Sequence, residues 1–241
     1  MIRIAAVGDV HLDEEMSGQY RAQLGTLADD ADVLLLAGDL TKHGTASEGR
    51  VVAEEFRDVG VPVIAVLGNH DYHSDEADKI TELMRAEGIT VLEGEGVTLD
   101  CPGGRLGVAG TKGFGGGFAG KAAPEFGEPE LKEFVRHGRD LAARYATALT
   151  GLDADVRVGL THYSPVKDTL AGEPPEIYLM LGSYLLAEAL DDAGAALGIH
   201  GHAHAGVECG MTPGGVRVRN VALPVLRRTY GLYSLEVPGE D

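Results

Sequence analysis

Residues 2–11 read Ile-Arg-Ile-Ala-Ala-Val-Gly-Asp-Val-His, a short apolar run that ends in glycine and continues into polar residues. The same pattern returns at residues 33–37, which lead to Gly38-Asp39, and at residues 61–67, which lead to Gly68-Asn69-His70-Asp71. These runs are rich in β-branched residues and too short for helices, so they predict buried strands of a parallel sheet. Each predicted strand therefore ends in a polar motif.

The segments around these strands complete an α/β pattern. Helix-forming composition predicts helices over 19–28 and 47–59, and apolar residues at three- and four-residue steps predict a long amphipathic helix over 131–149. Short extended pieces at 89–92, 97–99 and 106–109 predict a hairpin-type sheet, and the glycine-rich residues 110–118 predict irregular structure. The strand-and-motif pattern resumes at 156–160 and 196–199, with a helix expected at 184–190 and closing strands at 216–221 and 232–237. We therefore expect one α/β domain over 1–241, with two central sheets and helices outside.

Composition and charge limit the classes of function. The 241 residues are 44% hydrophobic and 24% charged, which is typical of a folded chain with a sizeable core. A net charge of −18 disfavours non-specific binding to duplex DNA or to anionic membranes. No apolar run approaches the roughly 20 residues that a membrane span needs, and acidic residues stand where a secretory signal would be apolar. Two cysteines without Cys-x-x-Cys spacing favour a reducing, cytoplasmic location.

Polar residues collect just beyond five predicted strand ends, where α/β sheets bind ligands. Two carboxylates, one amide and four imidazoles form a set suited to Mn²⁺, Fe or Zn²⁺. That set is Asp9, His11, Asp39, Asn69, His162, His202 and His204. Because these residues exceed what one ion uses while leaving a position open for substrate, they predict two divalent ions that share a carboxylate and a bridging hydroxide nucleophile.

The motifs resemble those of the calcineurin-like metallophosphoesterases. Asp-x-His, Gly-Asp, Gly-Asn-His-Asp, His and Gly-His-x-His occur in that family's order between residues 9 and 204. The resemblance implies a four-layer αββα sandwich. It also implies that one ion is held by Asp9, His11 and His204, the other by Asn69, His162 and His202, and that Asp39 bridges them. It further implies that His70 acts near the leaving-group oxygen and that Asp71 orients His70.

Local departures from subfamily patterns narrow the substrate class. Gly38-Asp39 is followed by Leu-Thr-Lys-His-Gly, without the Asp-Arg-Gly continuation of the Ser/Thr protein phosphatases. Gly-Asp-Leu-Thr with Gly-Asn-His-Asp is more similar to the class III phosphodiesterase branch and to small bacterial phosphoesterases. That branch often carries His-His-Pro-Pro, whereas this chain has His162-Tyr163-Ser164-Pro165. Lys112 and Lys121 lie in a glycine-rich stretch that is either a mobile loop meeting the substrate or a surface loop.

Three functional hypotheses follow. The first is a phosphodiesterase or phosphomonoesterase for small phosphoesters, with no membrane and no nucleic acid as expected partners. The second is an Mre11-like nuclease, which needs a basic surface that the net charge of −18 argues against. The third is a non-catalytic interaction module on the same fold, which would be expected to have lost ligands. This chain retains every motif residue, so the first hypothesis is preferred.

Overall fold

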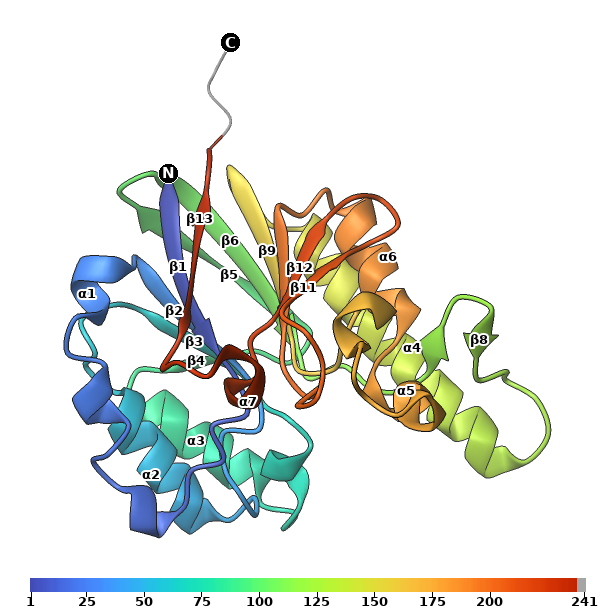
Figure 1. Ribbon diagram of the computed structural model, residues 1–241, viewed down its shortest axis with the longest axis horizontal. Coiled ribbons are helices and arrows are strands. Elements are labelled where there is room, and N and C mark those ends of the chain that lie inside the picture. The colour runs from blue at the N-terminus through green and yellow to red at the C-terminus, as the bar shows by residue number, and fades with distance from the viewer. Residues whose placement is uncertain (238–241) are drawn as a thin grey trace.

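Two β-sheets lie face to face in the computed structural model, which describes residues 1–237 (Figure 1). Residues 238–241 of the domain predicted over 1–241 lie outside the described part. Strands β2 and β3 of the first sheet contact β6 and β9 of the second, and helices cover the outer faces. The predicted α/β fold with two central mixed sheets and flanking helices is confirmed.

The first sheet has five strands in the order β13-β1-β2-β3-β4. The pairs from β1 to β4 are parallel, and β13 is antiparallel to β1. Its strands are β1 (Ile2–Val7), β2 (Val33–Ala37), β3 (Val63–Val66), β4 (Thr90–Val91) and β13 (Gly231–Leu235). Helices α1 (Leu27–Asp30), α2 (Ala46–Phe56) and α3 (Ala77–Ala86) connect these strands.

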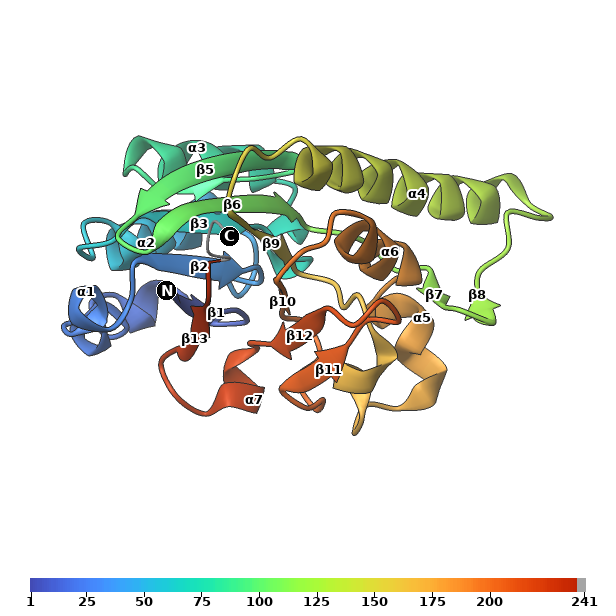
Figure 2. The ribbon, with the colours of Figure 1, turned by 90° about the horizontal axis from the view of Figure 1, so that it is seen from above.

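The second sheet has six strands in the order β11-β12-β10-β9-β6-β5. They are β5 (Glu95–Cys101), β6 (Gly104–Thr111), β9 (Val156–Thr161), β10 (Leu197–His200), β11 (Cys209–Met211) and β12 (Arg217–Asn220). The long helix α4 (Pro129–Thr150) packs against this sheet and against α6 (Tyr184–Asp192). Figure 2 shows α4 extending beyond the sheet toward the small hairpin of β7 (Gly117–Phe118) and β8 (Lys121–Ala122).

Short helices complete the chain between these elements. The α-helical turns are α5 (Tyr178–Leu181) and α7 (Leu223–Leu226). The 3-10 turns are η1 (Glu14–Met16), η2 (Arg21–Gln23), η3 (His70–Tyr72), η4 (Lys167–Leu170) and η5 (Pro175–Ile177). Turn η3 lies directly after β3 and carries part of the polar motif that follows this strand.

Local sequence signals explain where the main helices form. Helix α2 begins at a capping box, in which the Thr45 side chain accepts from the Glu48 backbone N–H and the Glu48 side chain accepts from the Thr45 N–H. Helix α4 presents Leu141, Tyr145 and Leu149 to the second sheet, as its apolar periodicity predicts.

Three expectations for individual segments were wrong. The helix expected at 19–28 is replaced by the turn η2 and the short α1, because the buried Glu55 carboxylate accepts hydrogen bonds from the N–H groups of Gly18 and Arg21 and holds this segment in an irregular path. Strand β4 pairs in parallel with β3 and takes no part in the hairpin, which consists of β5 and β6 alone. Gly110 and Thr111 belong to β6 and are not irregular.

The helices of residues 1–237 include none that combines the length and the apolar character needed to cross a membrane.

Candidate functional site

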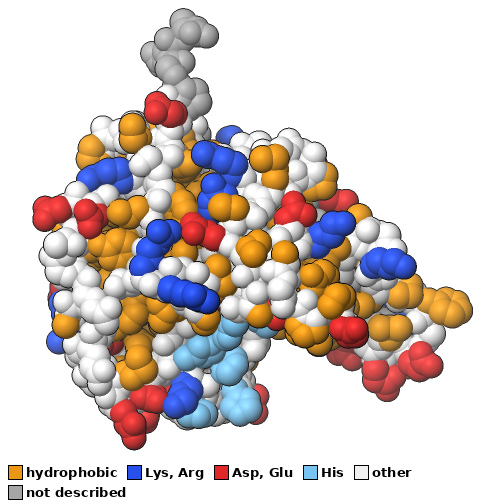
Figure 3. Space-filling model, in the orientation of Figure 1, with side chains coloured by type: hydrophobic (Ala, Val, Ile, Leu, Met, Phe, Trp, Pro, Cys, Tyr) orange, Lys and Arg blue, Asp and Glu red, His pale blue; other side chains and the backbone are white. Residues whose placement is uncertain are grey.

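The polar motifs meet at one edge of the paired sheets, where parallel strands end. Asp9 and His11 follow β1, Asp39 follows β2, and Asn69 and His70 follow β3. From the second sheet, His162 follows β9, and His202 and His204 follow β10. Figure 3 shows histidine side chains gathered in a single patch at the lower edge of the visible face. The parallel register of both sheets brings together residues that are far apart in the sequence.

These residues form two groups that share one carboxylate. Ligand atoms of Asp9, His11, Asp39 and His204 lie within 4.8 Å of one another. The same limit holds for Asp39, His162 and His202. Divalent ions such as Zn²⁺ are bound by such imidazole and carboxylate sets. All seven predicted ligands are brought to this site, since Asn69 also places its Oδ1 2.9 Å from the Nε2 of His162.

The Asp39 carboxylate faces both groups with different oxygens. Its Oδ1 lies 3.3 Å from the Nε2 of His162, and its Oδ2 lies 3.9 Å from the Nε2 of His11. The backbone N–H of His70 donates to Oδ1 over 2.8 Å, which fixes the plane of the carboxylate. This orientation is the one that a bridging ligand requires.

The hydrogen-bond partners of two histidine side chains show whether these residues suit a metal ion. The Nε2 of His11 is buried and has no hydrogen-bond partner within residues 1–237, and a buried polar atom without a partner is destabilising. The Nδ1 of His162 lies 2.9 Å from the carbonyl oxygen of Ala37 and must donate to it, which leaves Nε2 unprotonated in the neutral ring. The Nε2 lone pair of His162 faces another acceptor, the Oδ1 of Asn69, over 2.9 Å, and the Nε2 of His11 has no partner among the described residues, so both positions suit a divalent ion and the donor set fits one.

Four candidate ligands have left-handed backbone conformations. The φ angles are 57° at Asp9, 44° at His11, 50° at Asp39 and 70° at His202. Such conformations are uncommon outside glycine, disfavour the folded state by about 1–3 kcal/mol each, and cluster at functional sites. The backbone strain at this edge therefore coincides with the candidate ligands.

Glycines beside the ligands allow the two carboxylates to approach the backbone. A Cβ at Gly68 would overlap the Oδ1 of Asp39, and a Cβ at Gly201 would overlap the Oδ2 of Asp9. The glycines of the Gly-Asn-His-Asp and Gly-His-x-His motifs are thus explained by the space that the carboxylates occupy.

Burial tunes the ionisation of the candidate ligands. Burial raises the pKa of Asp9 to about 6, although the hydrogen bond from His204, over 2.8 Å, opposes this rise. The same hydrogen bond raises the pKa of His204. Burial lowers the pKa of His202 to about 3 and that of His162 well below its usual value. The imidazoles of His162 and His202 are therefore neutral near neutral pH, as metal ligands must be.

His70 lies at the edge of the centre, with its side chain 45% exposed and its Nε2 4.0 Å from the Oδ2 of Asp39. The expectation that Asp71 orients its ring is not met. The Nδ1 of His70 instead lies 2.9 Å from the carbonyl oxygen of Lys42. Sequence reasoning missed this partner because a backbone carbonyl has no residue-type signal.

Asp71 is buried and joins the loops that carry Asp39 and Asn69. Its carboxylate accepts from the backbone N–H groups of Leu40, Thr41 and Gly68 and from the Thr41 hydroxyl, at 2.6–3.3 Å. Burial, followed by the charge of Asp39, raises the pKa of Asp71 to about 6. These contacts indicate a positioning role through the backbone rather than through the His70 ring.

His200 is fully buried beside the centre and points away from both ligand groups. Its Nε2 lies 2.8 Å from the Thr169 hydroxyl, and its Nδ1 lies 2.7 Å from the carbonyl oxygen of Gly201. The ring thus supports the loop that carries His202 and His204. Thr169 is a supporting residue for which the sequence offered no motif.

Known proteins resemble this chain in fold and in one family pattern. No curated protein matches the chain. Among solved structures, phosphopantetheinyl hydrolase of Mycobacterium tuberculosis is 17% identical with a TM-score of 0.67, and the match covers 91% of this chain and 88% of that chain. A Thermus thermophilus protein is 18% identical with a TM-score of 0.55, with coverage of 98% and 99%. A purple acid phosphatase from yellow lupin seeds is 15% identical with a TM-score of 0.52, with coverage of 86% and 38%.

At these identities the structural likeness shows the fold alone. The sequence itself matches the model of the calcineurin-like phosphoesterase family over residues 2–206, a range that includes both groups of candidate ligands. From this match, together with the two sheets and the ligand sets at their common edge, we conclude that the chain belongs to the calcineurin-like phosphoesterases.

Proposed function

We propose that the protein is a dinuclear, metal-dependent phosphoester hydrolase that acts on small phosphoesters. The observation that carries the proposal is the position of Asp39, whose two carboxylate oxygens face two different sets of ligand atoms. Asp9, His11 and His204 would hold one ion with Asp39, and Asn69, His162 and His202 would hold the other. Mn²⁺, Fe and Zn²⁺ suit this mixture of nitrogen and oxygen ligands.

Divalent ions at these positions would neutralise the charge of the phosphoryl group and lower the pKa of bound water toward about 7. The protein's own residues orient the reaction. Asp39 fixes the spacing of the two sites, and the Nδ1 contact of His70 with Lys42 leaves its Nε2 on the side of the centre. Because Nδ1 donates to the Lys42 carbonyl, a proton at Nε2 makes the ring an imidazolium, and in this form His70 is proposed to deliver the Nε2 proton to the leaving-group oxygen.

Other properties support a small substrate inside the cell. The net charge of −18 opposes the approach of a polyanion, whereas the ligand set can create a local positive site for one phosphate group. Both cysteines are free thiols, with Cys101 partly buried and Cys209 exposed, which favours a reducing, cytoplasmic environment.

Metal reconstitution tests the proposal. Protein stripped with a chelator is titrated with Mn²⁺, Fe²⁺ or Zn²⁺, and metal content is measured beside hydrolysis of p-nitrophenyl phosphate and bis-p-nitrophenyl phosphate. We expect two ions per chain at saturation and release of p-nitrophenol only after the second ion binds. The Asp39→Asn protein, purified in the same way, controls for contaminating phosphatases. Saturation at one ion, or equal rates in both preparations, contradicts the proposal.

A further inference from the structure

Lys112 lies beside the metal centre but takes no part in the ligand groups. It follows β6, on the same edge of the second sheet as His162. Its backbone carbonyl accepts hydrogen bonds from the N–H groups of His162, over 3.1 Å, and Tyr163, over 3.0 Å. Its own N–H donates to the Glu93 carboxylate over 3.2 Å. The position of Lys112 relative to the candidate ligand His162 is therefore fixed by the backbone.

The Lys112 ammonium is buried among aromatic rings and leaves hydrogen-bond donors unused. The residue is 8% exposed, and within residues 1–237 its Nζ donates only to the carbonyl oxygen of the adjacent Gly113, over 3.2 Å. The ring centres of Tyr72, Phe114 and Tyr163 lie 5.2, 5.0 and 5.4 Å from Nζ. Aromatic faces attract a cation but accept few of its N–H groups, so the ammonium is incompletely satisfied. Burial lowers the pKa of Lys112, and the charges of Glu93 and Asp39 oppose this effect.

The aromatic rings also relate the ammonium to the ligands. The Tyr163 ring lies 4.4 Å from the His202 ring and 5.6 Å from the His162 ring, and Tyr72 belongs to the same turn as His70. One aromatic side chain, Tyr163, thus separates Lys112 from the second ligand group, which consists of Asp39, His162 and His202. The ammonium therefore lies near the second ligand group without belonging to either group.

We propose that Lys112 binds a second phosphate group of the substrate, attached beside the phosphoester that is hydrolysed. Buried cations in proteins are normally paired, and a phosphate supplies the acceptors that the aromatic rings do not. Tyr72, one of the three rings around the ammonium, is 40% exposed, and the proposal requires this side chain to turn so that a phosphate reaches Nζ. The inference rests on the proposed function and specifies its substrate class as small esters with two phosphates.

The test uses two substrates that differ only in the second phosphate. These are thymidine 5′-(p-nitrophenyl phosphate) and its 3′-phosphorylated form, which share the leaving group. In Lys112→Met we expect KM for the 3′-phosphorylated substrate to rise about tenfold, the effect of one charge-assisted hydrogen bond, while KM for the other substrate is unchanged. Lys112→Arg retains the charge and should recover most of the loss. Lys121→Met, which removes an exposed lysine of β8, serves as the matched control.

A second measurement does not depend on turnover. Calorimetry compares binding of thymidine 3′,5′-bisphosphate and thymidine 5′-monophosphate to metal-loaded wild type and Lys112→Met, with metal content and Tm recorded for each. Selective loss of bisphosphate affinity at unchanged metal content supports the proposal. Equal changes for both ligands, or a lower Tm with no change in either affinity, overturn it. Wild-type protein that binds the bisphosphate selectively but hydrolyses neither ester would contradict the proposed function and leave this inference standing.

Discussion

The two oxygens of the Asp39 carboxylate give this residue a different role from every other candidate ligand in the described chain. A terminal ligand serves one ion, whereas Asp39 belongs to both ligand groups. Its left-handed backbone, with φ of 50°, is one that asparagine also tolerates, so an Asp39→Asn protein should keep its fold. The residue can thus be tested without disturbing its surroundings.

Asp39→Asn is expected to weaken both metal sites by about 100-fold or more, because the change removes a negative charge and replaces one ligand oxygen with an amide NH₂. Elemental analysis after dialysis against a weak chelator measures the loss. Asp153→Asn, which alters an exposed carboxylate paired with Arg105 at 3.0 Å, controls for the general change in charge. Loss of one ion with the other retained would show that Asp39 does not bridge.

His70→Gln should have the opposite effect to Asp39→Asn, because it should slow turnover without removing metal. Glutamine retains hydrogen-bonding atoms but cannot supply a proton at neutral pH, so we expect full metal content and turnover reduced by about 100-fold or more. The side chain is 45% exposed, and stability should therefore change little. If metal is lost in parallel with activity, His70 is a ligand and its proposed role is wrong.

The site also shows which residue roles a sequence can reveal. The ligand types and their strand-end positions were readable because carboxylates and imidazoles after β-branched runs are a distinctive combination. The hydrogen-bond partners of Asp71 and His70 could not be predicted from the sequence, because both residues bind backbone groups of the loop after β2. Lys112 was identified only as one of two lysines in a glycine-rich segment, and its burial depends on rings contributed by three separate loops.

At the scale of elements, helix α4 packs a polar atom against the second sheet. The Tyr145 hydroxyl is buried and has no hydrogen-bond partner within residues 1–237. It lies over β9 at Gly159, where a Cβ would overlap it. Burial accordingly raises the pKa of this phenol. The helix and the strand accommodate the ring, but the hydroxyl contributes an unsatisfied donor and acceptor.

Tyr145→Phe should therefore stabilise the protein by about 1 kcal/mol, because it removes a buried polar group without a partner and preserves the ring. Chemical denaturation measures this change. Tyr145→Ala is the contrasting variant and should destabilise by about 3–5 kcal/mol through the cavity that it leaves. A clear loss of stability in Tyr145→Phe would mean that the hydroxyl has a partner, such as an ordered water.

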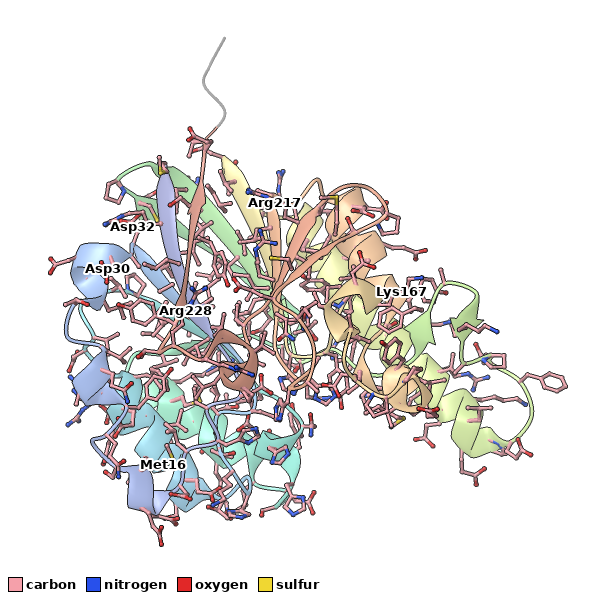
Figure 4. All side chains as sticks on the ribbon, in the orientation of Figure 1. Met16, Asp30, Asp32, Lys167, Arg217 and Arg228 are labelled. Atoms are coloured by element: carbon pink, nitrogen blue, oxygen red, sulfur yellow. The ribbon has the colours of Figure 1, made fainter. Side chains whose placement is uncertain are left out.

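A second element-level contact fastens β1 to the start of β2. Asp32 precedes β2, and its Oδ1 lies 2.7 Å from the Nη2 of Arg3; Figure 4 labels Asp32 beside α1. Burial acts to raise the pKa of Asp32, but the hydrogen bonds and charge of Arg3 outweigh it and leave the pKa below its usual value. A carboxyl whose pKa is lower in the folded state stabilises the fold above its unfolded pKa and loses this contribution as the pH falls.

Arg3→Met should accordingly destabilise the protein near neutral pH. The difference from wild type should shrink as the pH falls below about 4, where the aspartate of the unfolded chain becomes protonated, and disappear below the lower pKa of folded Asp32. Denaturation curves at several pH values measure the difference. The effect should be modest, because the Arg3 side chain is 41% exposed and solvent screens the pair. A difference that is constant between neutral and acidic pH would assign it to packing of the arginine stem.

Element prediction succeeded where a local signal and the tertiary environment agree. The strands β1 and β2 were predicted residue for residue, because a run of buried β-branched and aliphatic residues has few other solutions. The segment at 19–28 failed because its path is decided by Glu55, a residue of α2. Strand β4 was assigned to the wrong sheet because two residues carry no information about their partner.

At the scale of the whole molecule, the chain combines an acidic surface with a site whose candidate ligands suit divalent cations. The sheets place carboxylates and imidazoles from residues 9–204 at one edge, and bound divalent ions would make the local charge there positive. The whole chain has 38 acidic and 20 basic residues, and most of these side chains lie outside the site, so the surface carries the acidic excess. Individual arginines do not reverse this excess, since Arg228, for example, which Figure 4 labels, is paired with Glu208 at 3.4 Å. Figure 3 shows both basic and acidic side chains scattered over the visible face.

This charge distribution predicts selectivity by substrate size. A small phosphodiester needs to enter only the local positive site, whereas a duplex must lay many phosphates along the acidic surface and releases few counterions in return. We expect Mn²⁺-stimulated hydrolysis of bis-p-nitrophenyl phosphate and weak cleavage of duplex DNA at about 0.15 M salt. Lowering the salt should not rescue DNA cleavage, because weaker screening strengthens the repulsion. Efficient duplex degradation at this salt, with small esters left intact, would favour the nuclease hypothesis instead.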